Sequence, residues 1–302
     1  MKVEKTEKSE VIAEIGRLCS GAYEDSQSIR TASLNRIRDV IRKKHEHIGF
    51  STTEKKIAKE DRDFSKKYMD KNLPKLLETM LKKKELTEQE SDYLNEVLEI
   101  SDESAKLETR YKGLMDDYIE GELIYQQFLS HVRGVGAVIS AKLIRNFGDC
   151  GKYQHVSSLW QHCGFGVVDG HAPKLQKGVK VSYSPKFRTF VWQIGDSLMK
   201  QRSPIYREIY DAEKTRQASL MEQKAENAPK SKLHADLRAR RKMVKVFLCH
   251  YYLASRELAG LEIGEPFVQG KLGHKDIIGW RAVVTANKEA KPKQRKKKQG
   301  EI

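Results

Sequence analysis

The apolar residues of the first 120 positions recur at steps of three and four, and no stretch there alternates apolar with polar residues. Steps of three and four place side chains on one face of an α-helix, whereas a strand needs a step of two. The step is seen in two runs: Ile12, Ile15 and Leu18, then Leu34, Ile37, Val40 and Ile41. This part of the chain is therefore predicted to be a helical arm of the coiled-coil type.

A helix start is marked inside this arm by Thr87-Glu88-Gln89-Glu90. A threonine followed three residues later by glutamate is a capping box, in which each side chain accepts a hydrogen bond from the other residue's backbone N–H. The apolar face of the helix that follows is expected to hold Tyr93, Leu94, Val97 and Leu98. Residues 44–72 are poor in apolar positions and are predicted to be a loop or a weakly packed helix.

The pattern changes at residue 121, where shorter amphipathic helices begin. Gly134 and Gly136 lie between two of them, and Gly148 marks the end of the second. Residues 164–186 are rich in glycine and lysine, so a small irregular or β-containing insert is predicted there. Helix resumes at residues 187–199 and 205–221. One face of the longest regular segment is predicted to hold Leu233, Leu237, Val244, Phe247, Leu248, Tyr251 and Leu258, opposite Arg238, Arg240, Arg241 and Lys242.

These patterns predict a mainly α protein of three parts. Residues 1–120 form the helical arm, residues 121–285 form a helix-hairpin-helix domain with its insert, and residues 286–302 form a disordered basic tail with the run KPKQRKKK. The arm is expected to self-associate into a homo-oligomer or to pack against the basic domain, because its helices are amphipathic and its charge is nearly balanced.

Net charge divides the chain at the same place. Of a total of +15, residues 1–120 contribute −2, with 24 Lys and Arg against 26 Asp and Glu, which leaves +17 for residues 121–302. A strongly basic half beside a nearly neutral one is typical of a protein that binds a polyanion. The alternative is a lysine-rich surface that serves only to keep the protein in solution.

Several classes of protein are excluded by composition. No apolar run approaches the roughly 18 residues that a membrane helix needs, and the first ten residues lack the apolar stretch of a secretory signal. We therefore expect an intracellular protein without a membrane partner, cytoplasmic and associated with the nucleoid. Cys19, Cys150, Cys163 and Cys249 form no C-x-x-C pair, so neither a disulfide framework nor a metal site is predicted, and no cofactor is expected.

The strongest local motif is Arg133-Gly134-Val135-Gly136-Ala137, between two amphipathic helices. Glycines allow a tight turn and let backbone N–H groups at the start of the second helix approach a phosphate, which the helix dipole also favours. Lys142 and Arg145 follow about one and two turns later. All of these residues are predicted to hold a nucleic-acid backbone without reading its sequence, with an ordinary helix–turn–helix corner as the alternative.

The insert is the second predicted contact. Its basic residues are Lys174, Lys177, Lys180, Lys186 and Arg188, and they are interleaved with Phe165, His171, Tyr183 and Phe187. Such a stretch can follow a phosphate backbone while its rings stack on exposed bases. A solvated surface loop is the alternative, but the position of the insert directly after the hairpin favours one shared binding surface.

The sequence contains no recognisable catalytic motif. It has no P-loop, no H-E-x-x-H and no nucleophile elbow. The carboxylates of the basic half are scattered, at Asp149, Asp169, Asp196, Asp211 and Asp276. Their spacing does not show that any two share a Mg²⁺ ion, and no base is recognisable near Ser182 or Ser184. No catalytic residue is assigned from the sequence.

The order of motifs over about residues 125–280 resembles the C-terminal domain of DEDD-type (Piv/MooV-like) insertion-sequence transposases. The resemblance is carried by HVRGVGAVISAKLIRNFGDC, SSLWQHCGFGVVDG, SPKFRTFVWQIGDSL, SPIYREIYDAEKTR, RARRKMVKVFLCHYYLASREL and EPFVQGKLGH. The arm and GELIYQQFL look similar to archaeal transposase-like proteins. The resemblance implies a helix-hairpin-helix fold and DNA as the partner, in a family whose activity is DNA transposition and recombination.

Two departures from the family bear on activity. Its active members have an N-terminal RuvC-like domain with four acidic residues on a β-sheet, whereas residues 1–120 show no strand pattern. The family's serine followed by glycine is also missing, because the comparable stretch reads Asp169-Gly170-His171. We therefore expect a DNA-binding, transposase-like protein without the family's nuclease site. The alternatives are an active transposase that uses Mg²⁺ with a rearranged site or a partner, and a protein that binds structured RNA or has a structural role.

Overall fold

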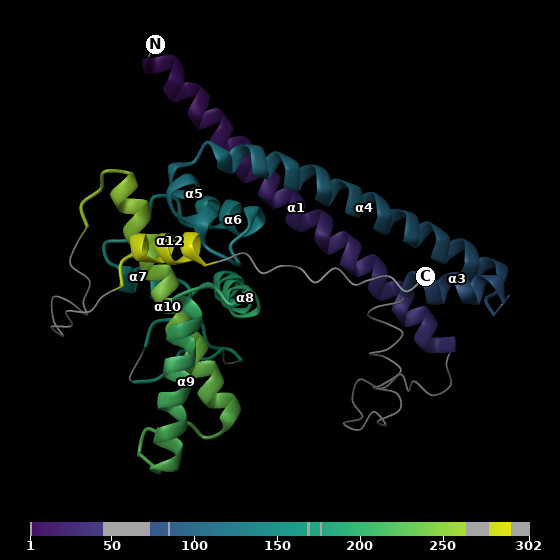
Figure 1. The fold of residues 1–302 in the computed structure, drawn as a ribbon. Coiled ribbons are helices and arrows are strands. Elements are labelled where there is room, and N and C mark those ends of the chain that lie inside the picture. Colours follow the sequence, from purple (N-terminus) through teal and green to yellow (C-terminus); the bar gives the residue numbers. More distant parts are fainter. Residues whose placement is uncertain are drawn as a thin grey trace. The chain divides into compact units, whose positions relative to one another are not determined.

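The computed structural model of the chain is mainly helical (Figure 1), which confirms the predicted fold class. It describes residues 2–44, 73–83, 85–167, 170–175, 177–263 and 278–290, and over these residues it contains no β-strand. None of the described helices combines the length and the apolar character needed to cross a membrane. Of the predicted loop or weak helix at residues 44–72, Lys44 is the last residue of α1, and residues 45–72 lie outside the described residues, as does the tail from residue 291 onward.

The chain divides into two compact units, Met1–Met115 and Asp116–Ile302, and helix α4 runs across the boundary. The first unit contains α1 (Lys2–Lys44), α3 (Leu73–Lys82) and most of α4 (Glu88–Glu120). The second contains α5 (Leu123–Gln127), the 3₁₀ helix η2 (Leu129–His131), α6 (Ala137–Phe147), α7 (Val156–His162), α8 (Pro185–Lys200), α9 (Tyr206–Glu222), α10 (Lys232–Leu258) and α12 (Trp280–Glu289). The first residues of the predicted basic tail are therefore helical, as part of α12.

In the first unit α1 and α4 lie side by side and run in opposite directions (Figure 1). Arg30 of α1 pairs with Glu108 of α4, with 2.5 Å between Arg30 Nε and Glu108 Oε1. Further along α1, Ile37 shares a buried cluster with Leu94, which lies near the start of α4. The short helix α3 contributes Met80 to the same cluster. The three helices therefore enclose an apolar cluster at the end of the arm where α3 packs.

Two predicted helix ends are confirmed. The backbone N–H of Thr87 donates to the Glu90 carboxylate at 2.9 Å, and the N–H of Glu90 donates to the Thr87 hydroxyl at 3.2 Å, which is the capping box at the start of α4. Helix α6 ends at Gly148, whose φ of +56° is in the region that favours glycine.

The buried face that α1 and α4 share follows a seven-residue repeat, and we call it the seam. The repeat advances by alternating steps of three and four, and not all of its positions are buried. The buried ones are Gly16, Cys19, Ser26, Ser33 and Ile37 on α1 and Leu94, Val97, Ser101, Ser104 and Met115 on α4. The half-buried Arg30 and Glu108 lie at further positions of the same repeat. Serine hydroxyls in the seam bond to the preceding turn of their own helix, as Ser26 does with the carbonyl of Ala22 at 2.8 Å. The middle of the seam is therefore small and polar.

Three residues that were predicted to lie on the buried faces of this unit are exposed instead. The exposed fractions are 48% for Ile15, 65% for Leu18 and 47% for Tyr93. The prediction is wrong here because steps of three and four fit two neighbouring faces of the same helix. In the middle of α1 and α4 the buried face is the one that holds the serines, and the large apolar residues lie beside it. The side chain of Ile12 lies outside the described residues.

Helix α10 is central to the second unit and packs against α5, α7, α8, α9 and α12. Its residues Val244, Phe247, Leu248 and Tyr251 are buried, as predicted. The Phe247 ring lies against the ring of Tyr206, with 5.6 Å between the centroids. This unit is therefore built around large apolar and aromatic side chains.

Two leucines that were predicted to share this face are exposed, Leu233 to 68% and Leu237 to 42%. The buried positions in the first turns of α10 are Ala235 and Ala239. Alanines allow α9 to pack closely along α10, and that close packing selects a face rotated away from the two leucines. The prediction failed because residue size, and not hydrophobicity alone, decides which face is covered.

A buried histidine joins α10 to the residues before α12. The Tyr206 hydroxyl and His250 Nδ1 are 2.9 Å apart, and His250 Nε2 lies 2.8 Å from the carbonyl oxygen of Ile278. Because a carbonyl only accepts, Nε2 carries the proton and Nδ1 accepts from Tyr206. Burial lowers the pKa of His250 to about 4, so the ring is neutral at pH 7.

Candidate nucleic-acid interface

The first glycine of the predicted hairpin is fixed by packing. Gly134 has a φ of +98°, and a Cβ atom there would lie 3.0 Å from the backbone oxygen of Ser197 on α8. The Ser197 hydroxyl donates to the Gly134 carbonyl at 2.6 Å. Glycine is therefore required at this position by the turn and by the close approach of α8. Val135, the next residue, is buried beneath the turn.

The second glycine has a different environment. Gly136 is exposed, its φ of −92° is open to any residue, and a Cβ atom there would meet nothing within 4 Å. It is the N-cap of α6, and no side chain caps the first turn, which begins at the half-buried Ala137. The first N–H groups of a helix have no acceptor within the helix, so those of α6 are open to an external acceptor.

The cations near the hairpin are engaged within the chain. The backbone N–H of Arg133 donates to Asn287 Oδ1 at 3.1 Å, and its guanidinium donates to the carbonyl of Ala290 at 3.2 Å. Lys142 and Arg145 are half buried, and each has a partner within the chain. The hairpin therefore presents backbone N–H groups, while its neighbouring side chains hold the second unit together.

Two arginines fasten the insert, which we call the lysine loop (residues 164–184). Arg188 of α8 donates to the carbonyl of Pro173 at 2.8 Å and to the Tyr183 hydroxyl at 2.9 Å. Arg241 of α10 donates to the carbonyl of Gly166 at 2.6 Å. Burial, and then the nearby Arg188, lower the pKa of Arg241. Of the predicted contacts, Arg188 is therefore used to position the loop.

A cation–aromatic cluster beside the loop was not found from the sequence. Arg241 lies over the ring of Phe165 at 5.3 Å from the centroid, and Lys245 lies over the ring of Trp160 at 4.0 Å. Burial lowers the pKa of Lys245, and the positive charge of Arg241 lowers it further. Arg241 and Lys245 are four residues apart on α10, a spacing that was visible in the sequence, but the rings they cover come from distant segments.

The lysines in the middle of the loop are exposed and have no bonding partner among the described residues. Lys174, Lys177 and Lys180 form no hydrogen bond or ion pair with any described residue. Lys186 is also exposed but has a partner within the chain. Burial lowers the pKa of His234 on α10, and the charges of Arg238, Lys230 and Lys174 lower it further. Positive charge therefore extends from the loop to the start of α10.

The basic face that was predicted for α10 is largely neutralised. Arg238 donates to the carbonyl of Asn227 at 2.6 Å, Arg240 pairs with Asp196, and Lys242 pairs with Glu213 at 2.8 Å. Glu213 is buried, which alone would raise its pKa, but hydrogen bonds from Arg216, Lys242 and Gln217 lower that pKa to about 2. Most cations of this helix therefore stabilise the fold.

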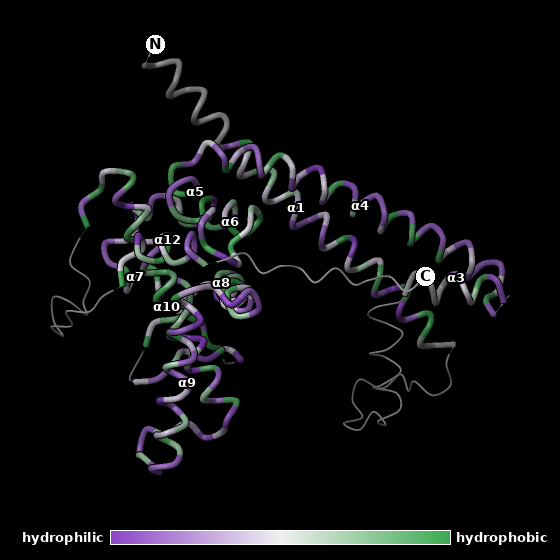
Figure 2. Tube along the Cα trace, viewed as in Figure 1, coloured by the Kyte–Doolittle hydropathy of each residue, from purple (hydrophilic) through white to green (hydrophobic). Residues whose placement is uncertain are grey.

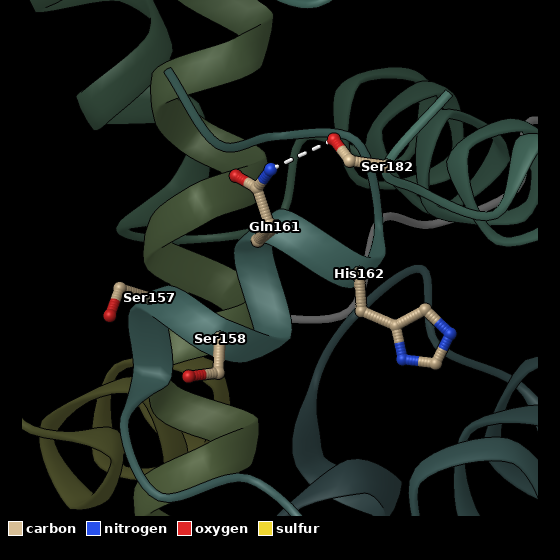
Figure 3. Close-up of a pocket in the computed structure, with 5 residues that line it drawn as sticks. All are labelled: Ser157, Ser158, Gln161, His162 and Ser182. Carbon is tan, nitrogen blue, oxygen red and sulfur yellow. Dashed lines mark hydrogen bonds between the residues drawn. The ribbon is translucent and has the colours of Figure 1, made fainter. Parts of the chain in front are cut away.

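An open hollow of about 580 Å³ lies beside α7 and is lined by Ser157, Ser158, Gln161, His162 and Ser182 (Figure 3). Gln161 Nε2 donates to the Ser182 hydroxyl at 3.1 Å, so the hollow reaches the end of the lysine loop. Burial, and then Lys152, lower the pKa of His162, so the lining is neutral at pH 7. Its hydroxyl and amide groups suit hydrogen bonding to a sugar or a phosphate, and it contains no carboxylate.

Two of the scattered carboxylates, Asp149 and Asp211, have separate partners. Asp149 accepts from the backbone N–H of Gly151 at 2.7 Å, and Asp211 pairs with Arg207 at 2.7 Å. Ser184 caps α8. Across the part of the chain that the structure describes, no three His, Cys, Asp or Glu side chains gather as metal ligands would. Asp169 and Asp276 lie outside that part. The described side chains around the lysine loop are therefore considered as binding groups.

Comparisons of the chain with protein-family models, with curated proteins and with solved structures found no match. The resemblance to transposases therefore depends on the order of sequence motifs, and the site is interpreted from its own geometry.

Proposed function

We propose that the second unit binds DNA through the sugar–phosphate backbone, without reading base sequence. The lysine loop supplies the main contact, and the first turn of α6 supplies a second one. The charge of +17 over residues 121–302 supports a polyanionic partner. The resemblance to transposases favours DNA over RNA.

The observation that carries this proposal is that some cations of the second unit have hydrogen-bond or ion-pair partners within the fold and others have none among the described residues. The cations of α10 are bound to carboxylates and carbonyls within the fold. The exposed Lys174, Lys177 and Lys180 have no such partner among the described residues. Lysines without an internal partner are surrounded by small counterions, which a phosphate backbone displaces on binding.

The hairpin adds a contact of another kind. Gly136 leaves the N–H groups of the first turn of α6 accessible, and the helix dipole favours an anion there. Lysine side chains adapt to many phosphate positions, whereas backbone N–H groups have a fixed direction. We infer that the hairpin orients the DNA and that the loop supplies most of the affinity.

Removal of the three loop lysines tests the proposal. In the full chain, K174A/K177A/K180A should make the negative slope of log affinity against log salt shallower by about 2 to 3, since each phosphate contact contributes about −0.9. The matched control removes three exposed lysines of the first unit, as K82A/K106A/K112A, with the same change in net charge. It should leave the slope nearly unchanged.

Two results decide whether the lysine loop is the interface and whether its partner is DNA or RNA. Equal slopes for the loop variant and the wild type would contradict the proposed interface. Competition between duplex DNA, branched DNA and structured RNA at one salt concentration then identifies the polyanion, because the A-form groove and 2′-hydroxyls of RNA present different contacts. If structured RNA displaces bound DNA more effectively than duplex or branched DNA does, the partner is RNA and not DNA.

A further inference from the structure

The first unit exposes large apolar side chains in a regular pattern. Hydrophobic residues recur singly along α4 (Figure 2). The large apolar residues that are exposed in the described part of this unit have exposed fractions between 40% and 65%, and they are Ile15, Leu18, Ile29, Tyr93, Ile100, Leu107 and Leu114. Scattered apolar residues are normal on a surface, but a contiguous patch marks a contact site. The relative positions of these seven residues therefore decide whether they are scattered surface residues or one contact site.

All seven residues lie beside the seam. On α4, Tyr93, Ile100, Leu107 and Leu114 are seven residues apart, and each directly precedes a residue of the seam repeat. In heptad notation the seam occupies positions a and d, and these four residues occupy position g. On α1, Ile15 and Ile29 also occupy position g, and Leu18 lies one turn from Ile15, at the adjoining position c.

The g residues of the two helices lie on the same side of the arm. In an antiparallel pair, reversal of one helix places its g positions opposite the g positions of the other, and its e positions opposite e. The seven residues therefore form one strip on one side of the seam. Because Arg30 pairs with Glu108, Ile29 of α1 lies beside Leu107 of α4, whereas Ile15 and Leu18 lie along α1 beyond the level of Leu114. Along α4 the strip extends for about 32 Å from Tyr93 to Leu114, because a helix rises about 1.5 Å per residue.

We propose that this strip is the contact surface of a homodimer, in which two copies of the first unit pack strip to strip as an antiparallel four-helix bundle. The strip has a heptad period, so its partner must be helical with the same period, and a second arm satisfies that requirement. A two-fold axis makes one patch sufficient for both sides.

Charge complementarity fixes the register of the dimer. With the two-fold axis at Leu107, Ile100 of one copy lies opposite Leu114 of the second copy. Glu103 and Arg110 each lie one turn beyond a strip residue, and both are exposed. Neither forms an ion pair with a described residue of its own chain. In this register Glu103 of each copy lies beside Arg110 of the second copy, which gives two symmetric pairs at the rim.

The first experiment measures the mass of the full chain by light scattering, at concentrations up to about 100 μM, where a weak dimer still forms. The wild type should be a dimer, and Leu107→Glu, which places two carboxylates at the axis, should be a monomer. Lys106→Glu is the matched control, because it adds a carboxylate at the neighbouring exposed position outside the strip, and it should remain a dimer. Circular dichroism confirms that each variant is folded. A monomeric wild type would overturn the proposal.

The second experiment tests the register and the identity of the partner. E103R and R110E should each weaken the dimer by about tenfold or more, because each places like charges together at the rim. The double variant E103R/R110E should recover wild-type affinity, since the pairs are restored with reversed sign. Weakening without recovery in the double variant would show that the strip binds something other than a second copy in this register, and would overturn the proposal.

Discussion

The two units place polar and apolar side chains in opposite ways. In the second unit Phe247 and Tyr251 are buried, and the loop lysines without a bonding partner among the described residues are outside. In the first unit the hydroxyls of Ser33 and Ser104 are buried in the seam, whereas Leu107 is outside. The second unit follows the usual rule for a domain with its own core. The first unit buries less apolar surface between its helices and retains a strip that another helical surface can cover.

The contrast teaches that similar helical periodicity can support two kinds of unit. Burial of large apolar side chains is the main source of folding free energy. A seam whose middle consists of serines supplies little of that energy. Stability in the first unit should therefore depend more on what it contacts, and stability in the second unit on its core. All three tryptophans of the chain lie in the second unit, so tryptophan fluorescence reports on that unit separately.

The largest effect is expected from truncation of the second core. Phe247→Ala should lower the free energy of unfolding of the second unit by about 3–5 kcal/mol, because the side chain is fully buried and leaves a cavity. Denaturant titration followed by tryptophan fluorescence measures this change. A loss below about 1 kcal/mol would show that the second unit does not depend on its apolar core, and so does not differ from the first unit in this respect.

The second largest effect is expected when the pH is lowered, because the second unit buries a neutral histidine, His250. The pKa of His250 is about 4 in the folded unit and about 6.5 in an unfolded chain, so the unfolded chain binds the proton more readily between these values. This histidine should therefore lower stability by up to about 3 kcal/mol as the pH falls from 6.5 to 4.

The control for this prediction is His250→Gln, which retains a donor for Ile278 and an acceptor for Tyr206 but does not titrate. Fluorescence-monitored unfolding at several pH values should show a shallower pH dependence for the variant. The same slope in both proteins would mean that other groups cause the acid sensitivity of the second unit.

The two hairpin glycines should respond differently. Gly134→Ala should cost about 1–3 kcal/mol of stability, because φ is +98° and the Ser197 backbone lies at 3.0 Å. Gly136→Asp should leave the melting temperature nearly unchanged but weaken DNA binding roughly tenfold or more, because it places a negative charge beside the phosphate. Lys142→Ala is a milder comparison. A folded Gly136→Asp protein that binds DNA as well as the wild type would show that the hairpin is only a structural corner.

The smallest effect is expected in the seam. Ser104 is buried and its hydroxyl bonds to the carbonyl of Ile100 at 2.8 Å, within its own helix. Ser104→Ala keeps the small size that close packing requires, so the loss of stability should be about 0.5 kcal/mol or less. Thermal melting followed by circular dichroism measures it. Replacement by leucine should cost more stability, because it places a much larger side chain at a buried position.

The helices could be predicted from the sequence, whereas the covered face of each helix was predicted only in part. The steps of three and four located α4 and α10, and the capping box located the start of α4. The same steps placed Leu18 and Leu233 inside, although both are exposed. Periodicity identifies a stripe of residues, but the neighbouring helix and the size of its side chains determine which stripe is buried.

The candidate site shows the same limit. The glycine turn before α6 and the exposed position of Lys174, Lys177 and Lys180 follow from local sequence. The internal roles of Arg133 and Arg188 do not, because their acceptors are carbonyls that the fold brings from elsewhere in the chain. A count of basic residues therefore overestimates the cations that are available to a ligand.

The fastening of the lysine loop has a consequence for the thermodynamics of binding. Arg188 holds the loop at Pro173 and Tyr183, and Arg241 holds it at Gly166. Each residue that becomes ordered on binding loses conformational entropy equivalent to about 1–2 kcal/mol. A loop that is already closed at several points has few such residues left, so most of its ordering occurs during folding and not during association. Arg188→Ala releases the loop, so more residues become ordered when DNA binds. We therefore expect calorimetry of this variant to show a less favourable binding entropy, with little change in the binding enthalpy.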